Sequence, residues 1–147
     1  GLASIERQAG DAIARCEHAA RQGAGLTIAH DRYPAPGEDP AAWRKRLMEL
    51  TVRVKRARDR WAEARQSVDV ALAQIDQAPE AIRLALELEY ARPFEQRRAP
   101  ELKEVEDRVR RVAGVRAALS PWRERASSEL GRHDDLLWAL QRMLREP

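Results

Sequence analysis

The stretch DPAAWRKRLMELTVRVKRARDRWAEARQSVDVALAQIDQA, residues 39–78, decides the fold of this chain. Asp39 followed by Pro40 is a typical helix start, because aspartate caps the first free amides and proline fits the first helical turn. No glycine or proline follows before Pro79. We therefore predict one continuous helix over residues 41–78, about 57 Å long at 1.5 Å per residue.

Apolar residues recur along this helix in alternating steps of four and three. This spacing predicts a coiled-coil seam that packs against another helix. The residues expected at the helix interface are Trp43, Leu47, Leu50, Val54, Trp61 and Val68, with Ala57, Ala64, Ala71 and Ile75 completing the seam.

Arginines flank the seam and allow two interpretations. In the first, the arginines bind phosphate groups or an acidic partner protein, because one guanidinium group can contact two phosphate or carboxylate oxygens at once. Alternatively, they pair with acids of the same chain, such as Glu101, Glu104 and Glu106, and lay their aliphatic stems over the seam. Self-pairing along the seam would set arginine against arginine, which disfavours it. These candidate binding residues are Arg44, Arg46, Arg53, Arg58, Arg60 and Arg65.

The rest of the chain also indicates helices. Proline and glycine positions and apolar spacing predict helices over 2–22, 79–91, 100–119 and 121–145, with a loop over 23–40. We expect residues 1–147 to form a single all-α domain of about five helices: an elongated helical bundle or antiparallel coiled-coil hairpin built on the helix over 41–78. Because that helix is long for a chain of 147 residues, part of its seam is expected to need a self-oligomer or a helical partner protein.

The composition narrows the class of protein. No apolar run approaches the roughly 20 residues of a membrane span, which predicts a cytoplasmic protein that does not contact membranes. Cys16 is the only cysteine, so no disulfide forms within the chain. The motif Cys16-x-His18 is too small for a metal site, and its two side chains would not share a helix face.

The sequence contains no motif for catalysis. Glycine-rich phosphate loops, paired-carboxylate motifs and nucleophile elbows are all missing. We therefore predict a protein without enzymatic activity, cofactor, metal or small-molecule substrate. The four tryptophans, Trp43, Trp61, Trp122 and Trp138, lie on or near apolar stripes and are expected in the core or an interface; stacking on nucleic acid would require them exposed beside arginines.

Three stretches resemble phage late-gene transcriptional activators of the RinA/ArpU type: DPAAWRKRLMEL (39–50), IDQAPEAIRLALELEYARP (75–93) and VEDRVRRVAGVRAALSPWRERASSEL (105–130). That family ends in a sigma-factor-like helix-turn-helix that binds DNA. The resemblance implies that Val109, Gly114 and Val115 form the core and turn of this unit, and that Arg116, Arg123 and Arg125 face DNA. Read from local rules alone, residues 101–119 are one amphipathic helix and Ser120-Pro121 starts the next.

Two functions follow from these observations. The first is a non-enzymatic binding protein. Its more specific version is a phage-type DNA-binding regulator of transcription or a packaging factor. The alternative is a structural or adaptor protein whose coiled coil binds another protein without nucleic acid. Salt-sensitive DNA binding that is lost on substituting Arg53, Arg58 and Arg60 would distinguish the first from the second.

Overall fold

The structure, a computed structural model, describes residues 1–91 and 99–146, with the side chains of 1–77, 91 and 103–146. This part of the chain contains three α-helices and no strand: α1 (Leu2–Gln22), α2 (Pro40–Tyr90) and α3 (Ala99–Arg145). The predicted all-α class is confirmed, and α1 has the predicted bounds. The expected count of about five helices is wrong for the described residues.

The count differs because two prolines do not end their helices. The helix predicted over 79–91 is the last part of α2, which continues past Pro79 to Tyr90. The helices predicted over 100–119 and 121–145 are one helix, α3, with Pro121 inside it. A proline removes one backbone hydrogen bond and crowds the preceding turn. A helix that is already nucleated on both sides can absorb this local cost.

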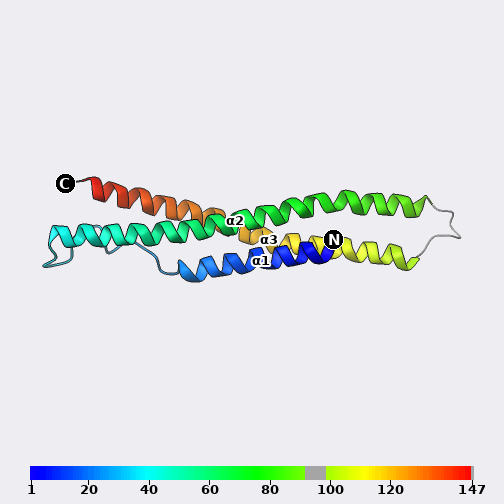
Figure 1. The fold of residues 1–147 in the computed structure, drawn as a ribbon, viewed down its shortest axis with the longest axis horizontal. Coiled ribbons are helices and arrows are strands. Elements are labelled where there is room, and N and C mark those ends of the chain that lie inside the picture. Colours follow the sequence, from blue (N-terminus) through cyan, green and yellow to red (C-terminus); the bar gives the residue numbers. More distant parts are fainter. Residues whose placement is uncertain (92–98, 147) are drawn as a thin grey trace.

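The three helices form an elongated body in which α2 and α3 run antiparallel (Figure 1). The shorter α1 packs alongside the middle of this pair and runs antiparallel to α2. The chain between α1 and α2, residues 23–39, is here called the connecting segment. It lies along the first part of α2 (Figure 1). The N-terminus therefore lies part-way along the body, and the C-terminus lies near the start of α2.

The core consists of two clusters along α2. In the first, small residues of α1 pack against α2 and α3 around Trp61, which is only 1% exposed. In the second, Ile28 of the connecting segment packs with residues near the start of α2 and with Leu140 of α3. The connecting segment thus covers the first part of α2, which α1 does not reach.

The predicted seam is buried within the chain itself. Every seam position from Leu47 to Ile75 is buried, and Trp43 is half-buried in the second cluster. The expectation that part of the seam would project beyond the helices of the chain is therefore wrong over residues 47–75. Residues of α3 spaced by seven are buried in the same way: Val112, Leu119, Ala126, His133 and Leu140.

His133 is the one polar residue among the buried side chains of the described chain, with 0% exposure. Its Nδ1 atom lies 2.6 Å from the carbonyl oxygen of Glu129. Its Nε2 atom is buried and has no hydrogen-bond partner among the described residues. His133 faces the end of α1, because a Cβ atom built on Gly23 would lie 3.6 Å from Nε2.

Candidate functional site

Three of the candidate arginines form a row of ion pairs along one edge of the α2–α3 interface. Arg123 Nε lies 2.9 Å from Asp69 Oδ1, Arg116 pairs with Asp76, and Arg58 pairs with Asp134. We call these three pairs the arginine–aspartate row. Its members are eleven and then seven residues apart on both helices. The antiparallel register is therefore unbroken over this length.

Arg46 ties the connecting segment to α2. Its guanidinium group pairs with Asp31 and donates to Glu38 Oε1 at 2.8 Å. The hydrogen bond from Arg46 is the main reason that the pKa of Glu38 is lowered, and the amide of Ala35 contributes a second hydrogen bond. The same contact with Glu38 raises the pKa of Arg46. This arginine therefore organises residues 31–38 within its own chain.

Arg44 lies against the end of α3. Its Nη1 atom donates to the carbonyl oxygen of Leu144 at 2.6 Å. The last carbonyls of a helix lack partners within the helix and carry partial negative charge. The guanidinium group thus caps the C-terminal end of α3 and fixes the start of α2 beside it.

Two further candidate arginines make weaker contacts. Arg65 Nε lies 3.8 Å from Asp69, one turn along α2. The guanidinium carbon of Arg125 lies 5.2 Å from the ring centre of Trp122 and 5.8 Å from that of Trp61. Arg125, which the resemblance places against DNA, here lies over core tryptophans.

Arg53 and Arg60 form no ion pair or hydrogen bond with a described residue. Arg53 is exposed and borders a shallow hollow together with Asp31 and Glu49. Arg60 is half-buried and borders a hollow with His18 and Glu63. The nine candidate arginines are therefore spread over several edges of the body and do not form one cationic site.

The expectation that the candidate arginines pair with acids near the start of α3 is wrong for Glu104 and Glu106 and stays a prediction for Glu101. Glu104 and Glu106 form no ion pair with any described residue, and the side chain of Glu101 lies outside the described residues. The acids that do pair with the candidate arginines belong to the connecting segment, to α2 and to the second half of α3: Asp31, Glu38, Asp59, Asp69, Asp76 and Asp134.

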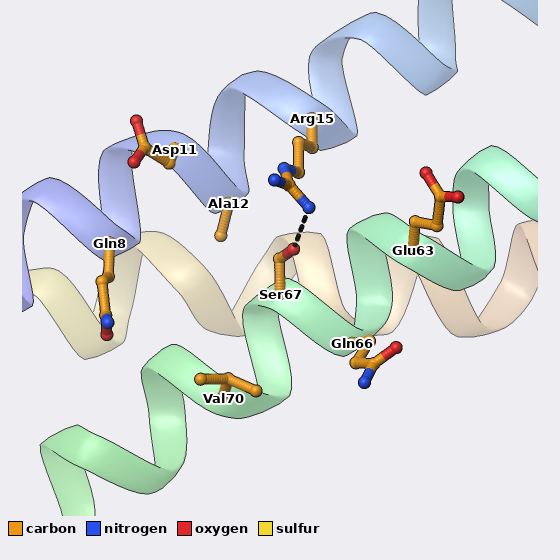
Figure 2. A pocket seen from close by; sticks show the side chains of 8 residues that line it. All are labelled: Gln8, Asp11, Ala12, Arg15, Glu63, Gln66, Ser67 and Val70. Carbon is orange, nitrogen blue, oxygen red and sulfur yellow. Dashed lines mark hydrogen bonds between the residues drawn. The ribbon is translucent and has the colours of Figure 1, made fainter.

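A groove of about 420 Å³ lies between α1 and α2 (Figure 2). Arg15 Nη1 donates to Ser67 Oγ across it at 3.1 Å. Its other lining residues mix acids, amides and apolar groups: Gln8, Asp11, Ala12, Glu63, Gln66 and Val70. Ser67, the one hydroxyl among these lining residues, accepts this hydrogen bond from Arg15 and forms no hydrogen bond with a base in the lining.

Several large apolar side chains are exposed on the outer faces of the helices. Trp138, expected in the core or an interface, is 60% exposed, and the guanidinium carbon of Arg142 lies 4.8 Å from its ring centre. On α2, Met48 and Val52 are 55% and 47% exposed. The seam predicted from the sequence already excludes Met48 and Val52, whereas the apolar stripe of the last helix passes beside Trp138 and left its exposure unpredicted.

The described residues hold no group of three or more potential metal ligands. Cys16 is fully buried, whereas His18 is exposed, as expected for two positions on different helix faces. Burial raises the pKa of the Cys16 thiol. None of the described helices carries an apolar stretch long enough to cross a membrane.

The residues carried over from the phage activators all lie within α3. Gly114, expected in a turn, is inside a continuous helix that includes residues 105–130. Val109 is exposed and Val115 is half-buried against the first core cluster. The structure thus forms no turn where the resemblance implied one.

No protein-family model, curated protein or solved structure matches this chain.

Proposed function

We propose that this chain is a non-enzymatic helical adaptor in which α2 and α3 form an antiparallel coiled-coil hairpin that binds another protein. Heptad spacing of buried residues on both helices supports the coiled-coil assignment. The connecting segment and α1 pack along one side of this hairpin. A rigid body of this kind presents defined helix faces to a partner without needing to fold on binding.

The arginine–aspartate row is the observation that carries this proposal. A nucleic-acid surface requires guanidinium groups that are free to contact phosphates. Arg58, Arg116 and Arg123 are instead committed to carboxylates of the opposite helix. Contacting phosphates would require these arginines to leave their aspartates, which bring negative charge to the same edge.

DNA binding is the experiment that tests the proposal. Fluorescence anisotropy of labelled duplex and single-stranded DNA, measured at about 50 and 200 mM salt, resolves the electrostatic contribution. We expect no salt-dependent binding by the adaptor. The adaptor proposal would be overturned by DNA affinity that falls steeply with salt and is lost in a variant with Arg53, Arg58 and Arg60 replaced by alanine. Molar mass in solution, with and without DNA, reports self-association in the same samples.

A phage-type DNA-binding regulator or packaging factor is the second candidate. Exposed cations on the first half of α2, including Arg53, Lys55 and Arg56, favour it. The resemblance of three stretches to phage activators points in the same direction. This candidate predicts the salt-dependent affinity that the adaptor lacks.

A further inference from the structure

We infer that the outer face of α2 around Met48 and Val52 is a docking site for an acidic amphipathic helix of a partner protein. This inference rests on the proposed adaptor function and names the chemistry of its partner. The site, here called the outer patch, consists of Lys45, Met48, Val52, Lys55 and Arg56.

The outer patch is a second stripe on α2, separate from the buried seam. Lys45, Met48, Val52 and Lys55 follow one another in steps of three, four and three, so they lie on one face of the helix. All of them are exposed. The intervening seam residues of this part of α2, including Leu47 and Leu50, are buried against α3 and the connecting segment. The patch therefore faces away from the rest of the chain.

The apolar centre of the patch is formed by Met48 and Val52. They are one turn apart, and about half of each side chain is exposed. A single exposed apolar residue is ordinary on a protein surface. Two neighbours at this spacing match the anchor positions that one helix offers to another, and methionine adapts readily to different apolar surfaces.

The charge around this centre is net positive, because Lys45, Lys55 and Arg56 outnumber Glu49, the exposed acid that lies between Met48 and Val52 in the sequence. Lys45, Lys55 and Arg56 form no ion pair or hydrogen bond with any described residue. In contrast, Arg46 and Arg58 on the edges of the same helix are paired with carboxylates. The acids nearest in sequence are Glu49 and Asp59, and Asp59 lies 4.0 Å from Arg58. Cations thus lie at both ends of the apolar pair.

An acidic amphipathic helix satisfies both features at once. Its apolar side chains cover Met48 and Val52, while glutamates or aspartates on its flanks meet Lys45, Lys55 and Arg56. A nucleic acid would use the cations and leave the two apolar side chains in water. A membrane surface would find only two apolar side chains to insert, which is little for an interfacial helix.

The direct test measures binding of a designed helical peptide to the full chain. The probe is a fluorescent peptide of about three heptads with leucine at the a and d positions and glutamate beside them. A scrambled peptide of the same composition keeps the charge and removes the apolar stripe. We expect the probe to bind and the scrambled peptide to bind at least about tenfold more weakly, a difference of about 1.4 kcal/mol.

Variants locate the site on the surface. Met48→Ser with Val52→Ser removes the apolar centre, and Lys45→Glu with Lys55→Glu reverses the charge. Each pair is expected to weaken probe binding by about tenfold or more. Val109→Ser on α3, which is also exposed, is the matched control and should leave binding unchanged. Thermal unfolding of each variant checks that the fold is retained.

The outcomes separate this inference from the adaptor function. Absence of probe binding, equal binding of the scrambled peptide, or wild-type binding by the Met48/Val52 variant overturns the docking site and leaves the adaptor proposal standing. If the chain binds DNA in a salt-dependent way and the variant with Lys45→Glu and Lys55→Glu does not, the patch is a phosphate-binding surface. That result overturns both the docking site and the adaptor proposal. Binding to anionic phosphatidylserine vesicles that is lost in the Met48/Val52 variant assigns the patch to a lipid surface and also overturns the inference.

Discussion

Asp69 and Arg123 face each other across the α2–α3 interface, with Oδ1 and Nε 2.9 Å apart. The pair is half-exposed, so water screens it and its contribution to stability is small. Its position is informative nevertheless, because it lies in register with the pairs at Arg58 and Arg116. Ion pairs at the edges of helix interfaces select orientation and register more than they add stability.

The first prediction concerns the energy of this pair. Asp69→Ala should lower the free energy of unfolding by less than about 1 kcal/mol, as for other exposed ion pairs. Urea denaturation, monitored by circular dichroism, measures this change in the free energy of unfolding. A loss of more than about 2 kcal/mol would contradict the view that the row acts chiefly on register.

The second prediction contrasts two tryptophans. Trp61→Ala should cost about 3 to 5 kcal/mol, because it empties the centre of the first core cluster. Trp138→Ala, at an exposed position, should cost less than about 1 kcal/mol. Chemical denaturation of both variants gives the comparison. Similar losses for the two would show that Trp138 is covered in solution, for instance by a second copy of the chain.

Much of the fold could be predicted from residues 39–78, whereas the fate of the arginines could not. The spacing of apolar residues reports which face of a helix is buried, and Leu47, Trp61 and Val68 are buried as predicted. The acids that pair with Arg46 and Arg58 lie on other elements. Their identity depends on antiparallel register and on the path of the connecting segment, which no local pattern encodes.

The third prediction concerns His133. Its Nε2 atom is buried without a partner among the described residues, and such a group costs about 1 to 3 kcal/mol. His133→Leu, which keeps a similar volume, should therefore raise the free energy of unfolding by about that amount. A lower stability would mean that the contact between Nδ1 and the Glu129 carbonyl outweighs the desolvation of Nε2.

The fourth prediction concerns acid pH. Arg46 lowers the pKa of Glu38 in the folded state, so the contact stabilises the protein above the unfolded-state pKa of about 4.3. That stability is lost as the pH falls through the lower folded-state pKa. Glu38→Gln should reduce the melting temperature near neutral pH and approach the wild type in strong acid. Glu49→Gln, at an acid that forms no ion pair with a described residue, is the control; an equal effect of both would contradict the assignment.

The last prediction concerns Pro121, which the sequence rules treat as a helix boundary. The missing amide of Pro121 leaves the carbonyl of Ala117 without its helical donor. Both residues are exposed, so water can solvate that carbonyl. Ser120 Oγ donates to the neighbouring carbonyl of Arg116 at 3.0 Å. Pro121→Ala restores the donor and removes the ring from the helix interior, and should stabilise the fold by up to about 3 kcal/mol. If thermal unfolding instead showed a loss, the proline ring would have a packing role, and α3 would owe its continuity to that contact and not to helix propagation on either side.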